Sequence, residues 1–149
     1  MKKVIIIHGP NLNLLGSREP DIYGTESLDE INAKLVQEAL QMGVELETFQ
    51  SNHEGAIVDR IQDVSGDVDA IIINPGAFTH YSYAIRDALV SVGALVIEVH
   101  LSNIYRREDF RQHSVIAPVA QGQISGMGPL GYKLALFGAL ETLSRQEEG

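Results

Sequence analysis

Apolar runs of strand length alternate with amphipathic helical segments along this chain, and this alternation limits the possible folds most. The runs at 4–7 and 70–73 are continuous and apolar, as is typical of strands buried on both faces of a parallel sheet. Parallel strands need right-handed crossovers, usually helices, that cover both faces of the sheet. The chain therefore predicts an α/β fold with a parallel sheet at its centre.

The pattern predicts five strands, at 4–7, 44–50, 70–73 and 95–99 and somewhere within 115–125. The second alternates more than the others and is expected at an edge. Helices are predicted at 28–42, capped by Ser27 with Glu30, and at 82–92. A third, marked by Ala56, Ile57, Ile61 and Val64, follows a turn at 51–55, and a short polar helix is predicted at 106–112. The last, at 130–144, is expected to pack through Leu134, Phe137, Leu140 and Leu143.

Five strands in one chain of 149 residues fit a flavodoxin-like doubly wound sheet of order 2-1-3-4-5, forming one domain over 1–149. Such folds bind ligands beyond the carboxyl ends of the strands, at the switch point between strands 1 and 3. The loops that follow those two strands are GPNLNLLGSREPDIYG at 9–24 and NPGAFTH at 74–80. The first loop far exceeds the usual length of about 2–6 residues, and such excess is more often functional than idle. Both loops are thus expected to form one site.

Composition excludes several classes of partner. The formal net charge is −9, and no run of Lys and Arg forms a basic stripe, which argues against nucleic acid and anionic membranes. Cysteine is absent, so a disulfide framework and a thiolate nucleophile are excluded. The apolar stretch after Lys3 is too short for a secretory signal, and none approaches the length of a membrane span. A cytoplasmic location is expected.

Two pairs of polar residues follow later strands. Glu98 and His100 are two apart, so their side chains leave the same face of a strand, and the carboxylate could orient the imidazole as an acid; a polar pair at a strand end is the alternative. Arg107 and Arg111 are four apart and would share one side of the short helix. They could grip a ligand or simply pair with neighbouring acidic residues.

Arg18 and Tyr23 are the sharper pair, because both lie in the long first loop. A phenol is a poor base at neutral pH, but a nearby cation lowers its pKa, and Arg keeps its charge. A lid at about 16–24 could close over a ligand, exclude water and deliver the base. The alternative is a surface Arg and a Tyr that anchors the loop by packing.

Other chemistries lack their motifs. No P-loop is present, and GxGxxG does not follow the first strand. No GxSxG elbow presents a serine nucleophile. His and carboxylate residues do not stand at metal-ligand spacing, so neither a metal nor a cofactor is expected.

Together these residues resemble type II 3-dehydroquinate dehydratase, over nearly the whole chain. The resemblance rests on five motifs in the family's order: the first loop at 9–24, SNHEG at 51–55, NPGAFTHYS at 74–82, EVHLSN at 98–103 and REDFRQHS at 107–114. It implies dehydration of 3-dehydroquinate to 3-dehydroshikimate in the shikimate pathway, by anti elimination through an enolate. Phe78, Tyr81, Tyr105 and Arg106 depart from the residues common in the family.

The resemblance implies a role for each matching residue. Tyr23 would remove the proton from C2, with Arg18 lowering its pKa. Asn11 would help stabilise the enolate, and His100, oriented by Glu98, would protonate the departing hydroxyl. The residues implied to bind substrate are Asn74, Leu101 and Ser102 for the carboxylate and Arg111, His80 and Asp87 for the ring hydroxyls, Asp87 from a neighbouring subunit.

The resemblance further implies a homo-oligomer, a dodecamer built from trimers, that needs no metal or cofactor. The competing hypothesis is a non-catalytic flavodoxin-like module that binds a nucleotide or flavin, in which the long loop is a lid without chemistry. Arg18 with Tyr23 and Glu98 with His100 distinguish the two, since a pure binder needs neither pair.

Overall fold

The computed structural model describes residues 1–17, 21 and 24–149. A parallel sheet forms its centre, with strands in the order β2-β1-β3-β4-β5. The strands are β1 (Lys2–His8), β2 (Val44–Gln50), β3 (Ala70–Asn74), β4 (Leu95–His100) and β5 (Gly122–Ser125). The predicted order, parallel pairing and edge position of the second strand are confirmed.

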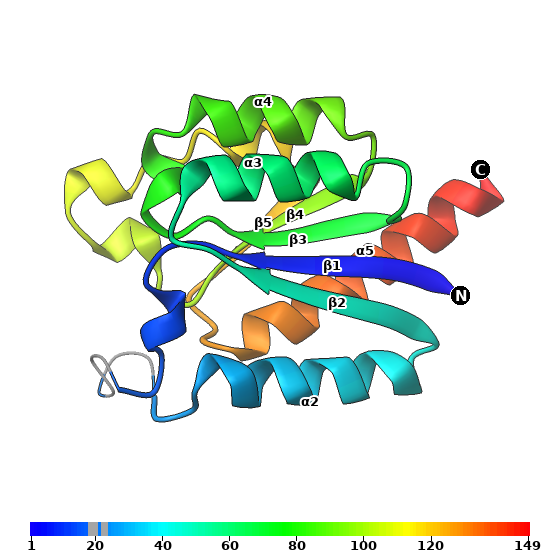
Figure 1. Ribbon diagram of the computed structural model, residues 1–149, viewed down its shortest axis with the longest axis horizontal. Helices are drawn as coiled ribbons and strands as arrows, with labels where there is room; N and C mark the ends of the chain where they lie inside the picture. Colours follow the sequence, from blue (N-terminus) through cyan, green and yellow to red (C-terminus); the bar gives the residue numbers. More distant parts are fainter. Residues whose placement is uncertain (18–20, 22–23) are drawn as a thin grey trace.

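Helices cover both faces of the sheet (Figure 1). On one face lie α2 (Leu28–Gln41) and α5 (Leu130–Glu148), and on the other α3 (Glu54–Asp63) and α4 (Tyr83–Ser91). Alternate residues of each central strand face opposite layers, so the sheet has two apolar cores. This explains why the central strands are continuous apolar runs.

Helix α2 begins as its sequence predicts. The hydroxyl of Ser27 accepts a hydrogen bond from the backbone N–H of Glu30 at 3.1 Å, which satisfies one of the free donors of the first turn. Asp29 and Glu30 place negative charge beside the positive end of the helix dipole. The cap fixes where the chain leaves the first loop.

The face through which α5 packs was predicted correctly only in part. Its buried residues are Gly131, Tyr132, Ala135, Leu136 and Ala139, whereas Leu134 is 40% and Phe137 is 55% exposed. Leu140 and Leu143 are partly buried at the margin of the core. The helix carries two apolar stripes, and the stripe with small residues lies on the sheet because they let the backbones approach closely. A Cβ on Gly131 would lie 3.2 Å from Val99 Cγ1.

The short helix predicted at 106–112 is also wrong. The segment forms two separate 3₁₀ turns, Ile104–Arg106 and Asp109–Arg111. Asn103 caps the first turn by accepting from the N–H of Tyr105 at 3.0 Å. Such short turns have too few residues to produce a helical apolar period.

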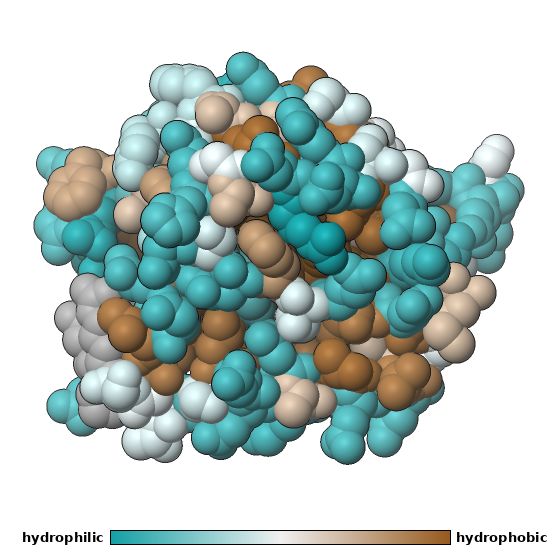
Figure 2. Space-filling view, in the orientation of Figure 1, coloured by the Kyte–Doolittle hydropathy of each residue, from teal (hydrophilic) through white to brown (hydrophobic). Residues whose placement is uncertain are grey.

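Polar side chains cover most of the face seen in Figure 2, and apolar ones gather in the lower half of that view, near α2 and β2. Within the described residues, no helix is long and apolar enough to cross a bilayer.

Candidate active site

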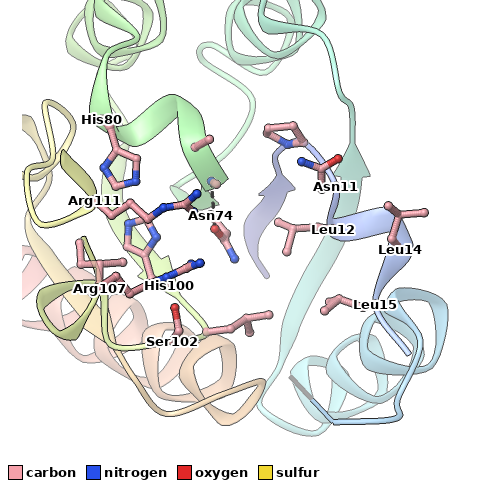
Figure 3. Close-up of a pocket in the computed structure, with 15 residues that line it drawn as sticks. Asn11, Leu12, Leu14, Leu15, Asn74, His80, His100, Ser102, Arg107 and Arg111 are labelled. Atoms are coloured by element: carbon pink, nitrogen blue, oxygen red, sulfur yellow. Dashed lines mark hydrogen bonds between the residues drawn. The ribbon is translucent and has the colours of Figure 1, made fainter. Parts of the chain in front are cut away.

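A cavity of about 300 Å³ lies at the carboxyl ends of β1, β3 and β4, where the fold predicts a ligand. One wall carries His80, His100, Ser102, Arg107 and Arg111, and the other carries Asn11 and leucines of the first loop, with Asn74 between them (Figure 3). The full lining is Pro10, Asn11, Leu12, Leu14, Leu15, Asn74, Gly76, Ala77, His80, His100, Leu101, Ser102, Ile104, Arg107 and Arg111. The predicted convergence of the loops after strands 1 and 3 is confirmed.

Asn11 turns the chain sharply after β1. Its φ of 70° is left-handed, and Asn is among the few residues other than Gly that adopt this conformation readily. The side-chain oxygen of Asn52 accepts from the Asn11 N–H at 3.0 Å. The turn after β2 thus holds the first loop in place, which explains why polar residues follow that edge strand.

Asn74 ends β3 and is 3% exposed. Its carbonyl accepts from the N–H of Gly9 at 2.7 Å, and its side-chain oxygen accepts from the N–H of Gly76 at 3.1 Å. Its side-chain nitrogen donates to the hydroxyl of Tyr132 at 2.9 Å. Asn74 therefore joins the loops after β1 and β3 to helix α5.

Glu98 and His100 lie on the same face of β4, as their spacing predicts. Glu98 Oε2 accepts from His100 Nε2 at 2.5 Å. Thr79 and Ser114 donate to the same carboxylate at 2.5 and 2.8 Å. Burial alone would raise the pKa of Glu98, but His100 and the two hydroxyls outweigh it and hold that pKa below its usual value. An ionised carboxylate behind the ring can hold a proton on His100, which reaches the cavity.

His80 lies in a 3₁₀ turn, Gly76–His80, before α4 begins at Tyr83. His80 therefore does not share a helix with Asp87, and exposed Asp87 does not line the cavity of its own chain. His80 Nδ1 donates to the carbonyl of His113 at 2.7 Å. In the neutral ring this leaves Nε2 as an acceptor, suited to a hydroxyl of a ligand.

The cavity is basic in a chain of net charge −9. Arg107 and Arg111 line it, and no Asp or Glu does among the described residues. Arg111 Nε lies 2.5 Å from Glu108 Oε2, so both interpretations of this Arg hold: it pairs with an acidic neighbour and also lines the cavity. Such a lining favours a small anionic ligand.

Arg18 and Tyr23 fall outside the described residues. Sequence reasoning left Arg107 between ligand binding and pairing with acidic neighbours, and it did not assign Ile104, Leu12 or Leu15 to the site. For Arg107 the signal was its place beside Arg111 in the same loop. The apolar residues gave no signal, because their types are equally common in a core.

These features define a class of protein: a doubly wound α/β enzyme whose site combines a carboxylate–histidine pair with donors for a small anion. Comparison with known proteins narrows the class. A sequence model of the family described as dehydroquinase class II matches residues 2–140. This chain belongs to that family.

Curated relatives are similar over nearly their whole length. A 3-dehydroquinate dehydratase of Pelotomaculum thermopropionicum is 60% identical over 137 residues, which is 92% of this chain and 95% of the relative. One from Bacillus cereus is 60% identical over 143 residues, 96% and 98% respectively.

Solved structures agree. The type II dehydroquinase of Butyrivibrio crossotus superposes with a TM-score of 0.90 at 50% identity, covering 93% of this chain and 97% of that one. A 3-dehydroquinate dehydratase-like protein from Bifidobacterium longum gives a TM-score of 0.72 at 33% identity, covering 97% and 99%.

Proposed function

We propose that this chain dehydrates 3-dehydroquinate to 3-dehydroshikimate, a hydro-lyase step of the shikimate pathway. Family membership supports the reaction. The single observation that carries it to this site is a basic cavity, free of acidic lining among the described residues, beside the Glu98–His100 pair. The cationic lining suits a substrate carboxylate, and the pair suits protonation of a leaving hydroxyl.

The reaction is an anti elimination in two proton transfers. Tyr23, its pKa lowered by Arg18, removes the proton from C2 next to the ketone, and the C2–H electrons form an enolate at the C3 oxygen. Asn11 helps to stabilise that enolate. The enolate then collapses, the C1–O bond breaks, and His100 protonates the departing hydroxyl, so that water and the enone are released.

The remaining residues bind the substrate. Asn74, Leu101 and Ser102 hold the carboxylate, and Arg111 and His80 read the ring hydroxyls. The acceptor nitrogen that His80 presents supports this role. Glu98 acts through His100, because the hydrogen bond on Nε2 leaves Nδ1 as the nitrogen that can meet a ligand.

The assay follows the near-ultraviolet absorbance of the enone as purified protein acts on 3-dehydroquinate. Tyr23→Phe removes only the phenol oxygen, so kcat should fall by about 10²–10⁴-fold, as for loss of a general base. Tyr83→Phe, which removes an exposed hydroxyl on α4, is the matched control and should keep wild-type kcat.

No absorbance rise with wild-type protein would reject the function and favour the non-catalytic binding module. Tyr23→Phe that retains more than about a tenth of wild-type kcat would reject Tyr23 as the base while leaving the reaction in place.

Family membership also supports a cytoplasmic homo-oligomer, which we propose is a dodecamer built from trimers. Helices α4 and α5 each expose large apolar side chains, among them Val90 and Phe137, and Asp87 is exposed on α4, where it can reach a neighbouring subunit's site. Light scattering at micromolar concentration should give about twelve times the mass of one chain. The mass of a single chain would contradict the dodecamer and the role of Asp87 across an interface.

A further inference from the structure

Four polar side chains, of which Asn32 is half-buried and the other three are buried, are linked by hydrogen bonds beneath the cavity. Asn74 Nδ2 lies 2.9 Å from Tyr132 Oη, Tyr132 Oη lies 3.1 Å from His8 Nδ1, and His8 Nε2 lies 2.8 Å from Asn32 Oδ1. His8 and Tyr132 are fully buried and Asn74 is 3% exposed. The four residues lie on β3, α5, β1 and α2. Together they form what we call the Asn32–His8–Tyr132–Asn74 relay.

The orientation of the Asn74 amide in the relay is fixed by its backbone neighbour. The backbone N–H of Gly76 can only donate, so the side-chain atom of Asn74 that it meets at 3.1 Å must be the oxygen. The Asn74 nitrogen then donates to Tyr132 Oη. The single proton of the Tyr132 hydroxyl finds its acceptor in His8 Nδ1, and His8 Nε2–H then donates to Asn32 Oδ1.

This arrangement requires a neutral His8 that carries its proton on Nε2. If His8 instead carried its proton on Nδ1, the Tyr132 hydroxyl proton would have no acceptor within the relay, and His8 Nε2 would face the oxygen of Asn32. Burying such unmatched groups is costly. Burial lowers the pKa of His8 to about 4, with Asn32 raising it in part, in agreement with a neutral ring.

We infer that the Asn32–His8–Tyr132–Asn74 relay is a positioning device that locks the Asn74 amide as a donor toward the cavity, and so makes the site select an anionic oxygen there. One N–H of Asn74 is held by Tyr132, its oxygen is held by Gly76, and the second N–H is left for a ligand. An amide free to rotate would offer its oxygen to the same position about as readily. The inference deepens the proposed role of Asn74 and rests on it for its kinetic readout.

Tyr132→Phe tests the relay, because it deletes the hydroxyl and keeps the ring that packs edge-on against His8. The KM for 3-dehydroquinate should rise about tenfold, the size of one lost hydrogen bond to a charged group. Because carboxylate binding is equal in ground and transition states, kcat should change less than about threefold. Tyr83→Phe on α4 is the matched control with unchanged KM.

A double-mutant cycle separates positioning from a general loss of structure. If Tyr132 acts through Asn74, adding Tyr132→Phe to Asn74→Ala should change KM by less than about twofold. If the double variant instead raises KM by the product of the two single-variant fold-changes, the inference is overturned. If Tyr132→Phe does not fold, Asn32→Ala provides the second variant, since Asn32 is only half-buried, and its rise in KM should likewise vanish in the Asn74→Ala background.

A measurement without substrate keeps this test separate from the proposed function. In wild-type protein the ¹⁵N resonances of His8 should show a protonated Nε2 and an unprotonated, hydrogen-bonded Nδ1, and the Asn74 side-chain amide should exchange slowly. Tyr132→Phe should shift the Nδ1 resonance and speed Asn74 exchange by more than about tenfold. Unchanged exchange, or a proton on Nδ1, would overturn the relay even in an active enzyme. If these resonances and exchange rates are as expected but the dehydration assay fails, the proposed function is rejected and the relay is not.

Discussion

His8 on β1 and Glu98 on β4 are both fully buried, yet the imidazole is neutral and the carboxylate is charged. Glu98 meets His100, Thr79 and Ser114, and these partners hold its pKa below its usual value despite burial. His8 meets only neutral partners, so burial dominates and lowers its pKa to about 4. The partners, and not burial by itself, decide which group stays charged.

The His8 shift predicts a loss of stability in acid. The unfolded ring titrates near 6.5 and the folded ring near 4, so between these values the unfolded state binds more protons. The free energy of unfolding should therefore fall as pH drops through this window, by about 1.4 kcal/mol per pH unit from this group and about 3 kcal/mol in total. Urea unfolding at fixed protein concentration, between about pH 4 and pH 7.5, measures the slope.

His8→Gln is the comparison, because it removes the titrating ring and keeps a polar side chain. The slope of its unfolding free energy against pH should be smaller across this window, by the contribution of about one bound proton. Equal slopes in the two proteins would show that His8 does not titrate as its burial requires.

At the scale of elements, the ends of β1 and β3 approach so closely that only glycine fits between them. A Cβ on Gly9 would lie 2.5 Å from the carbonyl oxygen of Pro75. Gly9→Ala should therefore lower the free energy of unfolding by about 1–3 kcal/mol, as for other overpacked sites, and distort the cavity. Thermal and urea unfolding, with KM measured in parallel, check this.

Gly55→Ala is its control. A Cβ there meets nothing within 4 Å, and the residue lies in the first turn of α3. This substitution should leave stability unchanged or raise it by about 0.5–1 kcal/mol. If both glycine variants behave alike, close approach of the two loops is not what Gly9 provides.

The proposed lid is also an element with its own test. Gly16 and Gly24 flank Arg18 and Tyr23 in sequence, and both adopt a left-handed φ, of 91° and 84°, which suits them as hinges. Limited trypsin should cut after Arg18 in the free protein, and saturating quinate, a similar cyclic carboxylate, should slow that cut. Cutting after Arg145 in α5 is the internal control. A cut after Arg18 at the same rate with and without quinate would argue against a closing lid.

Elements were predictable where one periodic signal dominated. The central strands and α2 have such a signal, and so the sheet order and the cap at Ser27 followed from sequence. Helix α5 carries two apolar stripes, and sequence alone did not say that small residues would lie on the sheet while Phe137 stayed exposed. The Glu98–His100 pair was predictable because strand spacing is local. The partners of His8 come from α2 and α5 and meet only in the folded chain.

At the scale of the whole molecule, the four lysines stand apart from the cavity. Lys2 and Lys3 begin β1, at the end of the strand away from the cavity. Lys34 on α2 pairs with Glu26 at 2.5 Å, and Lys133 lies on α5 with its Nζ 3.7 Å from Glu38. None lines the cavity. A lysine that forms an imine must contact substrate and be neutral, so this distribution supports an enolate mechanism and not a Schiff base.

Borohydride provides the test. Added during turnover, it should leave activity intact and add no mass to the protein, because no imine is available for reduction. A dehydratase known to form an imine serves as the positive control. A reduced adduct on any lysine, with loss of activity, would overturn the enolate mechanism.

The ammonium group of Lys2 pairs with the carboxylate of Glu147. Both ends of the described chain therefore lie close together beside the amino ends of the strands, away from the cavity (Figure 1). A short linker could therefore close the backbone into a ring without crossing any loop of the site. The turn at Gly66 precedes β3 at the same end of the sheet, and the circular backbone can be cut there to create new termini. A circular permutant with its new ends there keeps every site loop continuous. Catalysis by this fold thus depends on which strand ends lie together in space, and not on the order of the strands along the chain.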